Sequence, residues 1–208
     1  MYFNWNFVFS GSYKCGCHAG FDSVDNVSGV CKSPGPWNLL FSDGSNVISL
    51  NTTQRKEREV IFGEKRIQSL DFDPHTHIVF WTDPMDLSIK RSYIPESSNQ
   101  VEIGHPQVIV SFTKTAVPVD LAVDWVAQNL YWLEMDGQTS KGQVVTAKND
   151  GRYRRSVIPR GIDTPTSIVV NPIVGELYWS QAGTNPRIEV AWMDGMHIVH
   201  FVSISPIF

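Results

Sequence analysis

The sequence lacks several features that would assign it to common classes of protein. Its 208 residues include no apolar run of about eighteen residues, so we expect no membrane span within it. Its net charge of −4 comes without a cluster of basic residues, which argues against nucleic acid as a partner. No stretch of about ten residues or more has helical periodicity, which argues against a helical protein.

Familiar catalytic motifs are also missing. The chain has no H-E-x-x-H zinc motif, no G-x-S-x-G nucleophile turn and no phosphate-binding glycine loop. His75 and His77 are two residues apart, the spacing that would place two metal ligands on one face of a strand, and Asp73 lies nearby. However, Asp73 and Pro74 begin a turn, and a lone histidine pair is more often solvated than metal-bound. We therefore expect no enzyme activity, no metal and no other cofactor.

Three segments of the chain share one template. Residues 70–83, 121–134 and 168–181 each contain an Asp or Asn eight residues before a tryptophan. The tryptophans recur at intervals of about 50 residues, which is typical of propeller blades or helical repeats. The repeat-defining residues are Asp73, Trp81, Asp83, Asp124, Trp132, Asn171 and Trp179.

The composition of these segments favours strands. Residues 121–125 and 129–133 are short runs of aliphatic and aromatic residues, separated by a brief linker. The Asp-Gly pairs at residues 150–151 and 194–195 each separate two further runs. Asp-Gly is a strong hairpin signal because glycine supplies the positive φ of a tight turn. Each unit therefore has four strands, which predicts an all-β propeller.

The chain resembles the YWTD, or class B, repeats of the LDL receptor and related endocytic receptors. Residues 80–83 (Phe-Trp-Thr-Asp) are close to the family tetrapeptide. Residues 131–134 and 178–181 replace the final Asp with Glu and Gln, so we expect a weaker turn bond there. The resemblance implies a six-bladed β-propeller, of which residues 37–208 would form about three and a half blades.

The repeated residues have a structural interpretation. A tryptophan that occurs once per blade is most simply a core residue, because it offers a large apolar surface and one N–H donor. Asp73, Asp124 and Asn171 are expected to fix turns by accepting hydrogen bonds from nearby backbone N–H groups. Acidic residues at equivalent positions follow from the repeat, so they do not indicate a catalytic site.

Residues 10–33 resemble the C-terminal half of an EGF-like domain. This resemblance implies a disulfide between Cys17 and Cys31 and identifies Cys15 as a cysteine whose partner lies upstream in a complete domain. Cys15 is therefore expected to be unpaired, and any calcium-binding signature would lie in the missing half. Residues 1–9 are unassigned and have no signal-peptide features. We expect a fragment of a large endocytic receptor.

Two kinds of surface site are candidates. Asn51 and Asn26 begin N-glycosylation sequons, and the Thr at the third position of the first makes Asn51 the better candidate. His75, His77 and His105 are candidate pH sensors, because histidine titrates near endosomal pH. The alternative interpretation of these histidines is that they are ordinary exposed residues.

The predicted function is non-catalytic binding in the extracellular portion of a single-pass cell-surface and endosomal receptor. Its partners would be protein ligands or neighbouring receptor modules, and the membrane anchor would lie elsewhere in the parent protein. Receptor-mediated endocytosis with pH-dependent ligand release would be the context. One alternative is a secreted matrix protein that binds a partner through the same propeller. A weaker alternative is a metal-dependent propeller hydrolase.

Overall fold

The computed structural model describes residues 4–7, 13–16, 22–23, 31–32, 38–94 and 105–203. Every regular element among these residues is a β-strand, which confirms the predicted all-β fold class. A search of the same ranges finds no helix that is long and apolar enough to cross a membrane. The chain divides into two compact units, residues 1–39 with 49–57 and residues 40–48 with 58–208.

Short strands precede the propeller sheets. β1 (Asn4–Phe7) pairs antiparallel with β2 (Tyr13–Gly16), and β3 (Asp22–Ser23) pairs antiparallel with β4 (Cys31–Lys32). A three-stranded sheet then follows in the order β5 (Asn38–Ser42), β6 (Val47–Asn51) and β7 (Lys56–Ile61).

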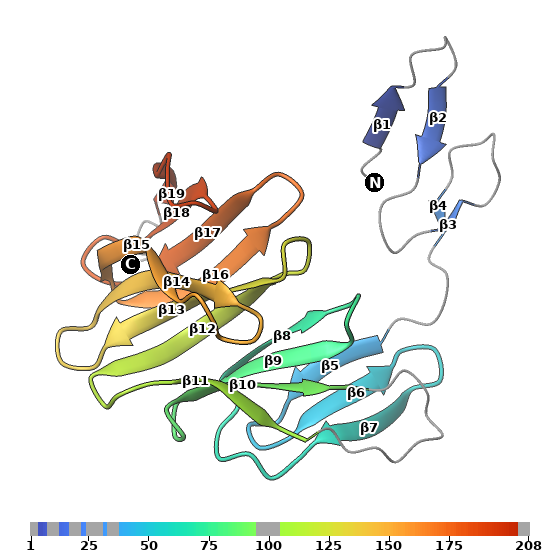
Figure 1. Ribbon diagram of the computed structural model, residues 1–208, viewed down its shortest axis with the longest axis horizontal. Coiled ribbons are helices and arrows are strands. Elements are labelled where there is room, and N and C mark those ends of the chain that lie inside the picture. The colour runs from blue at the N-terminus through green and yellow to red at the C-terminus, as the bar shows by residue number, and fades with distance from the viewer. Residues whose placement is uncertain are drawn as a thin grey trace, which may run out of the picture. The chain divides into compact units, whose positions relative to one another are not determined.

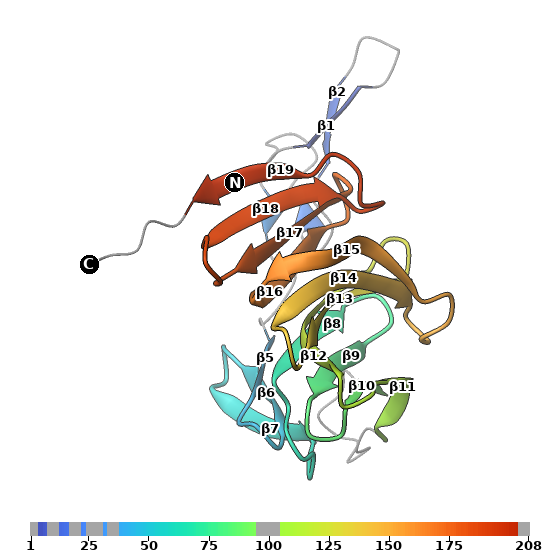
Figure 2. The same cartoon turned by 90° about the vertical axis from the view of Figure 1, so that its left-hand side faces the viewer.

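Three four-stranded antiparallel sheets make up most of the second unit, and they lie side by side in Figure 1 and Figure 2. The first contains β8 (Ser69–Asp73), β9 (Ile78–Asp83), β10 (Ser88–Tyr93) and β11 (Gln107–Ser111). The second contains β12 (Ala116–Asp124), β13 (Asn129–Asp136), β14 (Lys141–Lys148) and β15 (Arg155–Asp163). The third contains β16 (Pro165–Asn171), β17 (Glu176–Gln181), β18 (Arg187–Trp192) and β19 (Val199–Ser203).

Each of these sheets is a four-stranded meander, since neighbouring strands are consecutive in the chain. The first strands of consecutive sheets are joined by side chain–backbone hydrogen bonds. Asp71 Oδ2 on β8 accepts from Val123 N on β12 at 2.7 Å. Asp120 Oδ2 on β12 accepts from Ile168 N on β16 at 2.8 Å. Meanders joined in this way are propeller blades, so the predicted partial β-propeller is confirmed.

The core is divided among the contacts between sheets. One apolar cluster joins β6 and β7 to β9, a second joins β8–β11 to β12–β15, and a third joins β12–β15 to β16–β18. The largest fully buried side chains are Trp81, Trp132 and Trp179, one in each cluster. Each sheet is therefore stabilised mainly by its neighbours, which is how repeated units share a core.

Candidate interaction surface

The motif tryptophans define one face of each four-stranded sheet. Trp81 on β9, Trp132 on β13 and Trp179 on β17 are at most 2% exposed. Each belongs to a cluster with the sheet that precedes it in the chain. The preceding sheet contributes Val47 and Ile61 to the cluster of Trp81, Phe80 and Ile89 to that of Trp132, and Tyr131 and Val144 to that of Trp179. We call this side of a sheet the tryptophan face.

Successive side chains of a strand point to opposite sides, so each sheet has a second face. On the first two four-stranded sheets this opposite face contacts the next sheet. On β8–β11 this face includes Phe80 and Ile89, which are fully buried in a cluster with β12–β15. On β12–β15 it includes Ala122 and Tyr131, which are buried in a cluster with β16–β18. Two successive contacts therefore use the same pairing of faces.

The corresponding face of the third sheet is exposed. Val169 on β16 is 57% exposed and lies opposite Tyr178 in the strand ladder. The ring of Tyr178 meets that of Phe201 edge-on at a centroid distance of 5.7 Å. The pairing of β19 with β18 places further apolar side chains on this side. We call the following set the open face: Val169, Tyr178, Val199, Phe201 and Val202.

The repeat shows what normally covers such a face. Val169 aligns with Ala122, and Tyr178 aligns with Tyr131 and Phe80. The three earlier residues are 0–4% exposed. Burying one side chain of valine or phenylalanine size stabilises by about 1.5–3 kcal/mol. Exposed apolar side chains that gather on one face of a sheet in this way indicate a contact surface.

Polar groups on the first strands repeat as the apolar faces do. Ser69 and Asp120, each four residues before the Asp of the template, accept hydrogen bonds from the next sheet. Leu121 N donates to Ser69 Oγ at 3.3 Å, and Ile168 N donates to Asp120 Oδ2 at 2.8 Å. Ser167 holds the equivalent position on the third sheet, where it is exposed and donates to Asp120. Its hydroxyl oxygen is therefore placed to accept the N–H of a further strand.

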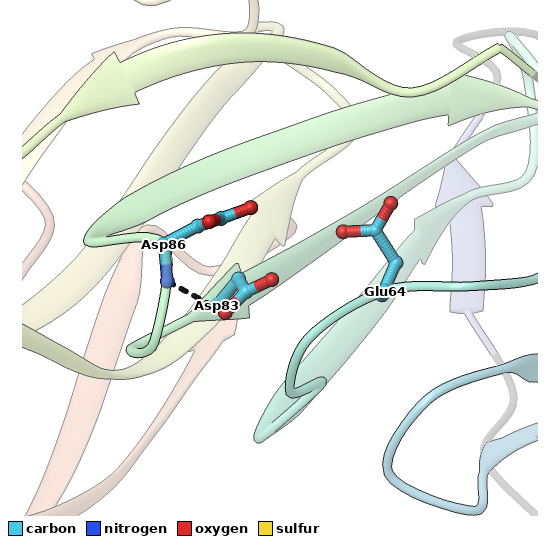
Figure 3. Close-up of side chains that lie close together, drawn as sticks. All are labelled: Glu64, Asp83 and Asp86. Atoms are coloured by element: carbon cyan, nitrogen blue, oxygen red, sulfur yellow. Dashed lines mark hydrogen bonds between the residues drawn. The ribbon is translucent and has the colours of Figure 1, made fainter.

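Three carboxylates come together at the end of the first four-stranded sheet, as Figure 3 shows. Oxygen atoms of Glu64, Asp83 and Asp86 lie within 4.8 Å of one another, a spacing that could hold a cation. Lys90 supplies that cation, with Nζ at 2.5 Å from Glu64, 3.3 Å from Asp83 and 2.6 Å from Asp86. Trp81 Nε1 donates to the same Glu64 carboxylate at 3.4 Å.

Ion pairing in this cluster raises the pKa of the lysine and lowers the pKa of a carboxylate. Burial by itself lowers the pKa of Lys90, but hydrogen bonds and charge from Asp86, Glu64 and Asp83 outweigh it and raise that pKa. Hydrogen bonds from Lys65 and Lys90 lower the pKa of Asp86. The cluster therefore remains a lysine–carboxylate ion pair network, and we assign no metal to it.

The final residues of the three tetrapeptides behave differently. Asp83 Oδ1 accepts from Met85 N at 3.1 Å and from Asp86 N at 3.0 Å, which closes the turn after β9. Gln181 in the third tetrapeptide instead donates from Nε2 to Asn185 O at 3.2 Å. The longer amide thus reaches a backbone carbonyl rather than the turn N–H groups.

Asp83 both pairs with a cation and closes a turn, and near the second tetrapeptide these two contacts are made by two different residues. Glu134 pairs with Arg154, whose Nη2 lies 2.5 Å from Oε2. Asp136, two residues further on, closes the turn by accepting from Gln138 N at 2.8 Å and Thr139 N at 3.0 Å. The turn bond is therefore displaced along the chain at this tetrapeptide.

The upstream residues of the template lie at the turns between first and second strands. Asp73 Oδ1 accepts from His75 N at 2.9 Å, and Asp124 Oδ1 accepts from Val126 N at 3.1 Å. Asn171 closes its turn with its backbone carbonyl, which accepts from the N–H four residues later at 2.9 Å. These side chains and carbonyls thus determine the path of the hairpins.

The candidate histidines do not form one site. His75 stacks on Trp125 of the next sheet, with ring centroids 5.1 Å apart, and its Nδ1 lies 3.8 Å from Asp73. His77 meets two aromatic rings edge-on. His105 is exposed just before β11. Of the three, His75 spans a contact between two sheets.

The candidate cysteines and sequons lie mostly beyond the described side chains. Cys17 and Asn26 fall outside the described residues. Cys15 and Cys31 are backbone positions within β2 and β4. The disulfide assignment and the boundaries of the EGF-like segment remain predictions. Asn51 is described, and it ends β6.

Sequence reasoning missed a fourth member of the repeat. Residues 40–43 (Leu-Phe-Ser-Asp), at the end of β5 and just after it, follow the tetrapeptide pattern. Asp43 Oδ1 accepts from Ser45 N at 2.9 Å and Asn46 N at 2.8 Å. These hydrogen bonds lower the pKa of Asp43. The order aliphatic–aromatic–small–Asp was the available signal. β5 therefore corresponds to the second strand of the later sheets.

Comparison with known proteins agrees with this geometry. No family model matches the chain. In the solved nidogen/laminin complex, one chain matches with a TM-score of 0.67 and 27% identity over 80% of this chain and 61% of that chain. A gluconolactonase from Xanthomonas campestris matches with a TM-score of 0.63 and 18% identity over 80% of this chain and 59% of its own. The fold is thus that of a partial YWTD β-propeller.

Curated relatives are receptors. The chain is 33% identical over 116 residues to a vitellogenin receptor of Solenopsis invicta, covering 56% of this chain and 6% of that receptor. It is 32% identical over 127 residues to the human low-density lipoprotein receptor-related protein 5-like protein, covering 61% and 46%. It is 31% identical over 150 residues to mouse low-density lipoprotein receptor-related protein 5, covering 71% and 9%. The chain is therefore a relative of the low-density lipoprotein receptor-related proteins, and it spans less than half the length of each of these three relatives.

Proposed function

We propose that this chain is a non-catalytic, partner-binding segment of the extracellular portion of an endocytic receptor. Its relatives by sequence are receptors, and it shares its fold with a protein solved in complex with a partner. The observation that carries the proposal is the open face of β16–β19. Its partner, on our proposal, is a neighbouring module that consists of a further sheet of the same repeat.

Two features support this partner. The tryptophan faces of β12–β15 and β16–β19 each cover the opposite face of the preceding sheet, so a further tryptophan face would fit the open face in the same way. On the third sheet, Ser167 holds the position that Ser69 holds on the first. Ser69 accepts an N–H of the next sheet from that position. The apolar contact and the polar contact therefore point to the same partner.

The open face can be tested by self-association in the absence of its partner. Val169 and Val126 are both 57% exposed, but only Val169 lies on the open face. We expect sedimentation velocity to show concentration-dependent association of the chain that Val169→Asp reduces several-fold. Val126→Asp is the matched control and should leave association unchanged. Equal effects of the two substitutions would contradict the proposal.

Release of ligand at endosomal pH is the finer part of this function. His75 supports it, since its ring stacks on Trp125 across two sheets and protonation would place a charge beside Asp73. A His75→Ala/His77→Ala chain should bind its ligand at neutral pH and release less of it at acid pH. An unchanged pH dependence would remove the histidines from this role.

A secreted matrix protein is the second candidate, favoured by the likeness to the chain in the nidogen/laminin complex. Direct binding of immobilised laminin by this chain would favour the matrix function over the receptor function. The hydrolase alternative has less support. The likeness to a gluconolactonase at 18% identity concerns the fold alone, and Lys90 occupies the carboxylate cluster.

A further inference from the structure

The hairpin between β6 and β7 presents an acceptor motif for glycan transfer at its tip. Asn51 is the last residue of β6, and residues 52–55 form the turn. Asn51 Oδ1 accepts from Thr53 N at 3.1 Å and from Gln54 N at 2.8 Å. The side-chain amide is thus held at the start of the turn, with its carbonyl directed at the backbone.

The surroundings of Asn51 leave room for a bulky group. Residues 52–57 are all exposed, while Asn51 itself is half-buried. Arg55 has a left-handed φ of 53°, which completes the turn and returns the chain into β7. A glycan is bulky and solubilising, so the folded chain accommodates one only where its first sugar meets solvent. The turn after β6 meets this condition.

We propose that Asn51 carries an N-linked glycan. The inference rests on the proposed function, because an extracellular chain passes through the secretory pathway where such transfer occurs. The sequence Asn51-Thr52-Thr53 supplies the asparagine and the hydroxyl at the third position that the acceptor motif requires. Neither the fold nor the relatives assign this modification.

The chemistry of the step is a substitution at a sugar carbon. The donor is a lipid-linked oligosaccharide diphosphate, and a cellular transferase catalyses the reaction. A bond forms between Asn51 Nδ2 and the anomeric carbon, and the bond from that carbon to the diphosphate oxygen breaks. The lipid diphosphate leaves with the electron pair, and the amide proton passes to a base of the transferase.

A glycan at this turn would also restrict how partners approach. No protein partner would bind at the β6–β7 turn, because a partner placed there would have to displace the sugar chain. The exposed charged residues at the end of the turn and the start of β7, Arg55, Lys56 and Glu57, would then be solvated rather than part of a protein contact. Partner binding would be left to other surfaces.

The test uses the full chain with a secretory signal peptide added, so that its outcome does not depend on the natural route of the protein. Asn26→Gln in every version removes the other sequon. We expect the secreted chain to lose apparent mass on treatment with peptide-N-glycosidase F. Adding Asn51→Gln or Thr53→Ala should abolish that shift, whereas Thr52→Ala, which keeps the motif, should retain it. Mass spectrometry after the enzyme treatment should locate the conversion to aspartate at position 51.

A matched positive control comes from another turn. Asp150 Oδ1 accepts from Arg152 N at 3.0 Å, which repeats the geometry of Asn51 and Thr53. Asp150→Asn with Arg152→Thr places a sequon there and should be glycosylated in a secreted chain that carries Asn51→Gln. The absence of a shift in the secreted Asn26→Gln chain, or a shift that persists after Asn51→Gln, would overturn the proposal. Failure of the receptor function would appear instead as unchanged self-association of the Val169→Asp chain.

Discussion

At the scale of single residues, two buried polar groups contribute to the contacts between consecutive sheets. Lys90 has a side chain that is 9% exposed, and Glu64 and Asp83 are 7% and 0% exposed. Its ammonium group therefore lies among three carboxylates, and little water could solvate these carboxylates if the ammonium group were removed. Asp71 is a second case, because its carboxylate on β8 accepts the N–H of Val123 on β12. Both residues determine how strongly one sheet holds the next.

Removing Lys90 should destabilise the protein strongly. Lys90→Met leaves three carboxylates together without their cation, and breaking a buried ion pair in this way costs about 3–5 kcal/mol. Lys65→Met is the matched control, since Lys65 also pairs with Asp86 but is 65% exposed. The control should cost less than about 1 kcal/mol. Urea denaturation followed by tryptophan fluorescence measures both, and equal costs would contradict the assignment.

Asp71 should make stability depend on pH with an unusual sign. Burial raises the pKa of Asp71, opposed by the N–H groups of Val123 and Phe72, and the nearby Asp120 charge adds to the increase. A folded-state pKa above the unfolded value favours the neutral acid in the fold. The contribution of Asp71 to stability therefore increases as pH falls through its folded pKa, and its charge is unfavourable at neutral pH.

Replacing Asp71 by asparagine isolates this effect. Asp71→Asn keeps an oxygen that can accept from Val123 N and removes the charge. We expect the variant to match or exceed the stability of the parent chain at neutral pH, and to lose any advantage at acid pH. Denaturation curves at several pH values check this. A variant less stable at neutral pH than at acid pH, relative to the parent, would show that the charge is favourable.

The sequence predicted part of this residue-level picture. A tryptophan once per unit indicated core positions, and Trp81, Trp132 and Trp179 are indeed buried. Lys90 could not be found in the same way, because its partner Glu64 lies 26 residues earlier and only the fold brings them together. The bond between Asp120 and Ile168 spans 48 residues and was hidden for the same reason.

At the scale of elements, the turns determine how the sheets fit together. The predicted Asp-Gly hairpins lie between β14 and β15 and between β18 and β19. Gly151 and Gly195 have φ values of 85° and 93°, as such turns require. Each turn also packs on the last strand of the preceding sheet. The sequence indicated the turn but not this contact, because a glycine at a tight turn does not reveal which other strand packs against it.

Alanine at these glycines should therefore cost more than a turn substitution alone. A Cβ at Gly151 would lie 2.0 Å from Ile109 O, and one at Gly195 would lie 2.3 Å from Val157 O. Gly175 also has a positive φ, 75°, but no atom lies within 4 Å of its added Cβ. Gly175→Ala is thus the control for backbone strain, at about 1–2 kcal/mol. Thermal unfolding should show a further loss of about 1–3 kcal/mol for Gly151→Ala, and equal losses would rule out the close contact.

At the scale of the whole molecule, each of the three four-stranded sheets turns its tryptophan face toward its predecessor, and the first two turn the opposite face toward their successor. The pattern of residues in the sequence predicted the propeller and its blade spacing. It did not predict which face of a blade turns toward which neighbour, since alternation gives two faces without naming their partners. The open face of β16–β19 emerges only when the buried faces of the first two sheets are compared with it. Its partner, on our account, is a further tryptophan face.

Adding such a face tests this account most directly. A second copy of residues 112–163, joined after Ser203, repeats the natural connection from β11 and supplies the β12–β15 sheet as a neighbour. The readout is the accessibility of position 169, introduced as Val169→Cys in all three proteins and followed by mass spectrometry of the labelled peptide, because the opposite face of the added sheet would itself be exposed. A thiol reagent should label this cysteine in the parent chain and label it several-fold more slowly in the extended chain. An extended chain with Trp132→Asp in the added copy should be labelled as fast as the parent. Equal labelling of position 169 in all three proteins would contradict the claim that the open face is built to receive a further sheet.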